Sequence, residues 1–322
     1  MQAILSTYTA LLHLQIDLAS GRVETTTIHR GRGIYFGITR GGDGYLVAAR
    51  NLDADRRRRD PSGPTNAIYR LDAGLRHFEP LIEHPILVDL HQIRAWDQML
   101  FVILGRGSAL ALFDIAGRRL DRVIDLAGAV PEDMPRHAPI DGDAFHMNSL
   151  TFAGGRLLVL AHNWDQRSFA LEFALPRRSW PGTLRRVAVH PGLGAMAHDI
   201  VRVGGVFHVL DSGSATLRTR ARRRREHLTS LASTTVRAFP RGMSMTRNHI
   251  LIGCGLHAAE RTAREAGPTR LVVLDRRSLA VRLDTQIGDY GNPADILVIS
   301  EPDLTDRPPS PRRRPPRRMR TG

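Results

Sequence analysis

The stretch HQIRAWDQMLFVILGRGSALALFDIAGRRLDRVIDL, residues 91–126, contains four short apolar runs separated by tight polar turns. The turns fall at Asp97-Gln98, at Gly105-Arg106-Gly107 and at Gly117-Arg118-Arg119. Short apolar runs bounded by such residues are typical of antiparallel strands. The stretch therefore predicts a four-stranded antiparallel unit.

The same unit recurs along the chain, which is the pattern to look for first in a sequence of this length. The comparable positions in the first strand of each unit are 44 to 55 residues apart, at Gly37, His91, His146, His198, Gly242 and Ala294. This spacing fits propeller blades of four strands each. We predict an all-β fold, a six-bladed β-propeller.

The sixth unit begins near Asp295 but provides one strand before the sequence becomes rich in Pro and Arg. Three strand-like runs at the other end of the chain, at residues 4–9, 11–18 and 22–27, have no unit of their own. Closing the last blade with these N-terminal strands removes an open sheet edge. We expect a propeller domain at residues 1–304 and a disordered Arg/Pro-rich tail at residues 305–322.

The charge of the 322-residue chain is strongly positive, at +14 with a pI of about 11.3. All 46 basic residues are arginine, which favours a compositional bias over a selected phosphate-binding surface. The arginine runs at 56–59, 222–225 and 312–314 fall in predicted loops or tail, and no aromatic residues are interleaved with them as single-strand binding requires. We expect no specific nucleic-acid partner.

Other features favour the cytoplasm. No apolar stretch approaches the 20 or so residues of a membrane-spanning helix, so no membrane partner is expected. Cys254 is the single cysteine and cannot form an intrachain disulfide. Residues 1–12 contain no basic residue before their apolar part, so no secretory signal is predicted.

The repeat layout of residues 1 to about 300 resembles six-bladed propellers of the gluconolactonase and strictosidine-synthase type. That resemblance implies one closed ring of six blades. Folds of this type include lactonases, lyases and binding proteins, so the function must be inferred from the site.

Three histidines stand where successive first strands begin: His91, His146 and His198. First strands line the channel of a propeller, so these side chains are expected to share one mouth. Three neutral imidazoles suit zinc or non-haem iron and leave a position for water or substrate. Histidines in a channel wall also bind water without metal, so a divalent cofactor is a hypothesis. His162 and His257 follow second strands and could line the same face.

Further candidates lie near the same strand openings. We expect Asp199 or Asp295 to act as general base, and Arg241 to bind a substrate anion or stabilise developing negative charge. Asp89 could orient a histidine. The candidates for substrate binding are Gln92, Asn148 and Asn292.

The function favoured by the sequence is that of a metal-dependent hydrolase, lactonase or lyase acting on a small polar molecule. The alternative is a non-catalytic propeller that binds a small ligand or a protein through the same face. Metal content and turnover discriminate the two.

Overall fold

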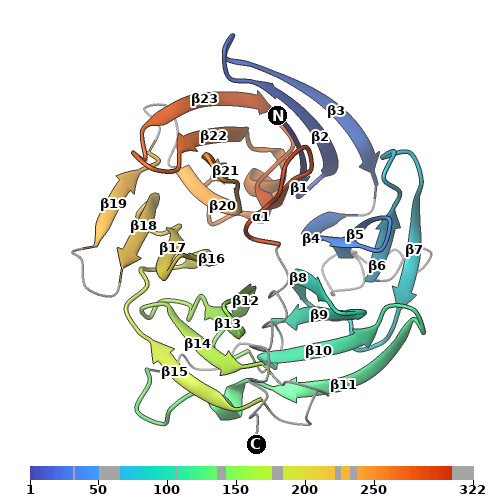
Figure 1. The fold of residues 1–322 in the computed structure, drawn as a ribbon, viewed down its shortest axis with the longest axis vertical. Helices are drawn as coiled ribbons and strands as arrows, with labels where there is room; N and C mark the ends of the chain where they lie inside the picture. Colours follow the sequence, from blue (N-terminus) through green and yellow to red (C-terminus); the bar gives the residue numbers. More distant parts are fainter. Residues whose placement is uncertain are drawn as a thin grey trace, which may run out of the picture.

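The computed structural model describes residues 1–31, 33–50, 66–105, 107–135, 143–175, 184–221, 226–232 and 238–306. Its strands form six antiparallel sheets of four strands around a central channel (Figure 1). The predicted six-bladed propeller is confirmed. The arginine runs at 56–59, 222–225 and 312–314 lie outside the described residues.

In each blade the first strand named below is the inner one and the last is the outer one. Blade 1 contains β4 (Ile34–Gly41), β5 (Gly44–Arg50), β6 (Ala67–Leu71) and β7 (Phe78–Glu83), and blade 2 contains β8 (Leu90–Trp96), β9 (Met99–Leu104), β10 (Ala109–Asp114) and β11 (Arg119–Asp125). Blade 3 contains β12 (Met147–Ala153), β13 (Arg156–Ala161), β14 (Phe169–Ala174) and β15 (Arg186–His190), and blade 4 contains β16 (Ala197–Val203), β17 (Val206–Asp211), β18 (Thr216–Ala221) and β19 (His227–Ser230). Blade 5 contains β20 (Ala238–Met245), β21 (His249–Leu256), β22 (Thr269–Asp275) and β23 (Val281–Gly288), and blade 6 contains β24 (Pro293–Val298), β1 (Gln2–Thr7), β2 (Ala10–Asp17) and β3 (Arg22–Arg30).

Helix is scarce among the described residues. A 3-10 turn (Ala127–Ala129) follows β11, and α1 (Arg261–Ala266) lies in the loop after β21. Neither is long enough to cross a membrane.

Blade 6 joins the two ends of the chain, as predicted. Its inner strand β24 pairs with β1 in the register Ala3↔Val298, Ile4↔Leu297 and Leu5↔Ile296. This pairing closes the ring without an open inner edge.

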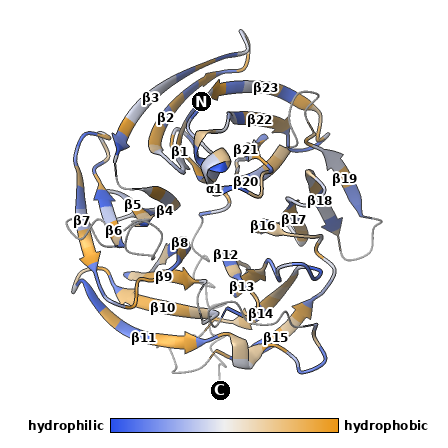
Figure 2. Cartoon of the chain, turned by 180° about the vertical axis from the view of Figure 1, so that it is seen from behind, coloured by the Kyte–Doolittle hydropathy of each residue, from blue (hydrophilic) through white to orange (hydrophobic). Residues whose placement is uncertain are grey.

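The hydrophobic core is divided among the interfaces between neighbouring blades. Each apolar cluster of the described residues joins two adjacent blades, such as Phe101 and Phe152 between blades 2 and 3. Inner and middle strands are mostly hydrophobic, whereas outer strands such as β3 and β19 carry many hydrophilic positions (Figure 2). Outer strands alternate because one of their faces meets solvent.

A β-bulge interrupts each inner strand at its pairing with the next strand. The shifts fall between Tyr35 and Ile38, Leu90 and Ile93, Met147 and Ser149, His198 and Ile200, Pro240 and Met243, and Pro293 and Asp295. A bulge leaves one or two residues outside the ladder and redirects their side chains. Here the redirected residues lie around the channel axis.

Gln92, in the bulge of β8, crosses the axis and joins three other blades. Its Nε2 donates to the Asp199 carboxylate of blade 4. Its Oε1 accepts hydrogen bonds from Ser149 Oγ and from the Leu150 backbone N–H of blade 3, both at 2.8 Å. Its Nε2 also lies 3.4 Å from Asp295 Oδ1 of blade 6.

Asp295 and Asp199 connect the remaining blades to this network. Asp295 Oδ2 accepts hydrogen bonds from the Ile38 N–H of blade 1 at 2.9 Å and from Arg94 Nη1 at 3.0 Å. Asp199 Oδ2 accepts a hydrogen bond from the Gly242 N–H of blade 5 at 2.6 Å. One buried polar network therefore includes all six inner strands.

The chain after β24 folds back onto the ring. Asp303 accepts hydrogen bonds from Ser244 Oγ and from the Val298 N–H. Asp306 accepts them from Thr39 Oγ1 at 2.6 Å and from the Arg40 N–H at 2.8 Å. The first two residues of the predicted tail, Thr305 and Asp306, are thus buried against the propeller, and residues 307–322 lie outside the described residues.

Candidate functional site

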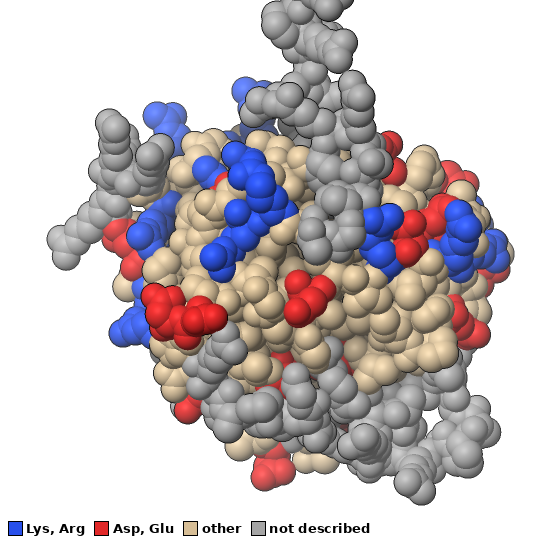
Figure 3. Space-filling model, turned by 90° about the horizontal axis from the view of Figure 1, so that it is seen from below, with Lys and Arg blue, Asp and Glu red and all other residues tan. Residues whose placement is uncertain are grey.

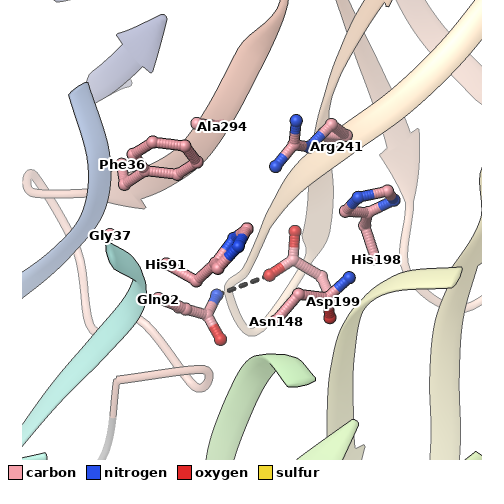
Figure 4. A pocket seen from close by; sticks show the side chains of 9 residues that line it. All are labelled: Phe36, Gly37, His91, Gln92, Asn148, His198, Asp199, Arg241 and Ala294. Atoms are coloured by element: carbon pink, nitrogen blue, oxygen red, sulfur yellow. Dashed lines mark hydrogen bonds between the residues drawn. The ribbon is translucent and has the colours of Figure 1, made fainter. Parts of the chain in front are cut away.

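A small pocket opens at the axis where the six bulges meet (Figure 4). Its volume is about 240 Å³ including the open solvent at its mouth, and the free space between its side chains is about that of one water molecule. The residues that line it all lie in or beside a bulge: Phe36, Gly37, His91, Gln92, Asn148, His198, Asp199, Arg241 and Ala294. Gly37 is required by close packing, because a Cβ there would lie 2.3 Å from the Ile93 nitrogen.

Aromatic rings form a continuous arc at this site, which we call the collar. Successive ring centroids are 4.8 to 5.3 Å apart along the order Phe36, His91, His146, His162, His198, Phe239 and His257. Neighbouring rings meet edge to face, which is a favourable aromatic geometry. His162 and His257 do fold inward to the face that the first-strand histidines occupy.

His91 and His146 form a compact group with Asp89. The donor atoms of these three side chains lie within 4.8 Å of one another. His91 is 4% exposed, and neither of its ring nitrogens has a hydrogen-bond partner. Asp89 Oδ1 lies 2.6 Å from Arg50 Nη1, while Oδ2 lies 3.8 Å from His91 Nε2.

The protonation of this group suits a cation. Burial lowers the pKa of His91 to about 4, against the opposing effect of Asp89. Burial would raise the pKa of Asp89, but His91 and Arg50 bring it well below its usual range. At neutral pH the group therefore presents a neutral imidazole and a carboxylate.

Hydrogen bonds fix the tautomers of the other collar histidines. His146 Nδ1 lies 2.7 Å from Asp143 Oδ2, so Nδ1 donates and Nε2 keeps its lone pair. His198 Nδ1 lies 2.9 Å from Ser212 Oγ, whose hydrogen goes to the Pro240 carbonyl, so this Nε2 also keeps its lone pair.

His162 has the opposite tautomer. Its Nδ1 accepts the Trp164 backbone N–H at 3.0 Å, so Nε2 carries the hydrogen. It lies between His146 and His198 in the collar. The structure thus brings His91 and His146 together and places His198 beyond a ring that is a donor. Among the described residues, Asp89 and not His198 is the third member of the compact group.

The surroundings of Asp89, His91 and His146 fit a divalent metal. Two imidazoles and one carboxylate are a common donor set for such ions. A carboxylate bonded to the far ring nitrogen, as Asp143 is to His146, is the kind of contact that orients histidines in metal sites. Gly105 leaves space at the group, because a Cβ there would lie 2.3 Å from Asp89 Oδ2 and 2.9 Å from His91 Nε2.

Asp199 is the carboxylate that lines the pocket. It is 4% exposed and has a left-handed backbone with φ of 52°. Burial raises its pKa well above the usual range, and Asp295 adds to this effect. A carboxylate tuned toward neutral pH can accept and return a proton.

The remaining predicted residues differ in their positions. Asn148 lines the pocket, donates from Nδ2 to the Ala197 carbonyl and has a buried Oδ1 without a partner. Asp295 is completely buried in the central network. Asn292 is equally buried and exchanges hydrogen bonds with the Leu256 backbone. Gln92 lines the pocket but its polar atoms serve the network.

Several residues of the site had no clear signal in the sequence. Asp143, Ser212 and Trp164 set histidine tautomers, and Phe36 and Phe239 complete the collar. Asp143 stands three residues before His146, as Asp89 stands two residues before His91, and this pattern could have identified Asp143 from the sequence.

The side of the molecule shown in Figure 3 has charges of both signs among its described residues. In Figure 3, acidic patches lie between arginine patches on the described part of that side of the molecule. Interspersed charges of both signs are ordinary for a soluble surface.

No protein-family model matches the sequence, and a search of curated proteins finds no match. Solved structures do match the fold. A chain of a nidogen/laminin complex is 8% identical, with a TM-score of 0.62 over 94% of this chain and 99% of that one. The periplasmic gluconolactonase PpgL of Pseudomonas aeruginosa is 14% identical, with a TM-score of 0.56 over 94% and 99%.

A putative 6-phosphogluconolactonase of Bacteroides fragilis is 12% identical, with a TM-score of 0.55 over 89% of this chain and 80% of that one. At these identities the similarity concerns the fold. The resemblance to gluconolactonase-like propellers is confirmed at that level.

Proposed function

We propose that this protein is a metal-dependent hydrolase of the lactonase type, with its site at the collar. The observation that carries the proposal is His91, whose two buried nitrogens lack partners beside the Asp89 carboxylate and His146. Leaving such atoms without a partner costs about 1–3 kcal/mol each, which an ion or a bound water would offset. The lactonases among proteins of similar fold favour this reaction class.

Asp89, His91 and His146 Nε2 would hold the ion. A divalent ion there would polarise a carbonyl group and lower the pKa of a bound water. The metal is therefore assigned to two of the three predicted histidines, with Asp89 in place of His198.

The protein's own groups would carry the proton. Asp199 would accept a proton from the water that attacks the lactone carbonyl, and return it to the ring oxygen as the carbon–oxygen bond breaks, giving a hydroxy acid. Its raised pKa suits both steps. His198 Nε2 would accept a hydrogen bond from the water or from the product hydroxyl.

Elemental analysis and a panel of γ- and δ-lactones, assayed by acid release, test the proposal. Protein purified without a histidine tag should contain about one divalent ion per chain. Asp89→Asn, His91→Gln and His146→Gln should lose metal and activity together. Asp143→Asn should weaken metal binding about 10- to 100-fold, since it removes only the orienting contact.

His208→Gln is the matched control, because His208 is similarly buried but lies in β17, away from the collar. It should keep both metal and activity. Metal binding without turnover of any lactone would contradict the enzyme and favour the alternative binding module. Full activity of metal-free protein would refute the proposed dependence on a metal ion.

A further inference from the structure

Arg241 is a buried cation with an unusual set of partners. It is 6% exposed and lines the pocket opposite His91 (Figure 4). Its Nη1 donates to the Tyr8 hydroxyl at 2.9 Å. Its guanidinium carbon lies 5.8 Å from the Tyr8 ring centroid and 5.9 Å from that of Phe36. All of these partners are neutral.

The nearby acid does not form an ion pair with it. Asp199 is close enough for its pKa to be lowered by Arg241. Its oxygens, however, accept hydrogen bonds from Gln92 and from the Gly242 backbone. Among the described residues, no carboxylate forms an ion pair with Arg241, whereas buried Arg94 pairs with Asp295 at 3.0 Å. A buried charge without such a partner is costly unless a ligand supplies one.

The free edge of the guanidinium has a definite geometry. Nη1 is engaged by Tyr8, while Nε is buried and has no hydrogen-bond partner. Nε and Nη2 donate in parallel, which matches the two oxygens of a carboxylate.

A second residue of the pocket wall also has an unsatisfied polar atom. Asn148 Nδ2 donates to the Ala197 carbonyl, which leaves Oδ1 as a buried acceptor in the pocket wall. A hydroxyl group would satisfy it.

We propose that the Nε/Nη2 edge of Arg241 binds a carboxylate of the substrate, so that the preferred substrates are small hydroxylated lactones that carry a free carboxylate. The assignment of the substrate as a lactone rests on the proposed function. The binding of a carboxylate by Arg241 does not depend on turnover. The carboxylate lies against the Arg241 edge where that side chain lines the pocket, and the ring lies at the collar near His91 and His146.

Binding of tetrahydrofuran-2-carboxylate, measured by titration calorimetry, tests this site without any reaction. The neutral tetrahydrofuran-2-carboxamide should bind at least tenfold more weakly, because a charge-assisted bidentate contact is lost. Arg241→Gln should weaken the carboxylate at least tenfold and leave the carboxamide nearly unchanged. Arg202→Gln is the control. Arg202 is near the end of β16 opposite to His198, lies over the Phe207 ring and pairs with Glu172, so its removal should change neither affinity.

Equal affinity of wild-type protein for carboxylate and carboxamide would overturn the inference, whether or not Arg241→Gln folds. Arg241→Lys keeps the charge but not the paired donors and should also weaken the carboxylate. Inorganic phosphate binding as tightly as the carboxylate would overturn the carboxylate assignment. Arg241-dependent binding in a protein that hydrolyses no lactone would support this site and refute the proposed function alone.

Discussion

Replacing Gln92 by methionine tests whether the central polar network holds the ring together. Methionine is close to glutamine in volume and shape, so the change removes hydrogen bonds and leaves little cavity. It deprives the Leu150 N–H, Ser149 Oγ and Asp199 Oδ1 of a partner. All of these atoms belong to buried residues in inner strands of other blades.

Each buried group left without its partner costs about 1–3 kcal/mol. Ser149 Oγ keeps one further hydrogen bond, from the Ile200 N–H at 3.3 Å. The cost of removing its bond to Gln92 is therefore at the low end of this range. We therefore expect the free energy of unfolding to fall by about 4 kcal/mol, which is large for one substitution.

Urea denaturation at pH 7, followed by tryptophan fluorescence, measures this change. Gln286→Met is the control, because Gln286 is exposed in β23 and its side chain bonds to Asp289, which is also exposed, at 3.0 Å. Its effect should stay within about 0.5 kcal/mol. A Gln92→Met protein within 1 kcal/mol of wild type, an approximate limit below the cost of a single unsatisfied group, would show that the blade interfaces hold the ring without the network.

Further predictions concern the metal group, pH, the chain end and nucleic acid. Gly105→Ala should reduce metal affinity at least tenfold, because the Cβ of the alanine would lie 2.3 Å from Asp89 Oδ2. Gly74→Ala, in an exposed turn, is the control and should leave metal affinity unchanged. Unchanged affinity in Gly105→Ala would show that Gly105 is not part of the metal site. Burial raises the pKa of Asp306 to about 7, so its contribution to stability is present below the unfolded pKa and is lost as pH rises toward 7. Asp306→Asn should therefore reduce the fall in unfolding free energy between pH 5 and pH 8, and an identical pH profile would contradict this. Deleting residues 307–322 should leave the melting temperature nearly unchanged, while deleting 303–322 should lower it by several degrees, because Asp303 and Asp306 bond to inner strands. Any binding of nucleic acid should be independent of sequence and should weaken steeply with salt, and tight sequence-specific binding at high salt would contradict this.

The fold could be predicted because its information is local and repeated. Apolar runs of strand length and turns with Gly or Asp recur at blade spacing, and the single strand near Asp295 lacks partners that residues 4–27 supply. A repeat of this kind can be recognised in the sequence without knowledge of any particular side-chain contact.

The site could be predicted only in part. His91 and His146 are adjacent because equivalent positions on successive blades meet at the axis. His198 does not contact His146, because the loop after β13 places the His162 ring between these two histidines. Bulges decide which residues face the axis, and a bulge depends on pairing between strands that is not visible in one strand's sequence. For this reason Asn292, close to the last bulge, satisfies backbone groups of Leu256 and not a ligand.

The pairing of β24 with β1 has a consequence for synthesis of the chain. Roughly 290 residues separate the two strands, and ribosomes add about 5–20 residues per second. The edge of β1 that pairs with β24 therefore stays unpaired for roughly 15 to 60 s, while the intervening blades emerge from the ribosome. During that interval a neighbouring nascent chain could add its own strand to the same edge. Moving residues 293–298 to a position before β1 by circular permutation would supply the partner strand first and should raise the yield of monomeric protein at high expression.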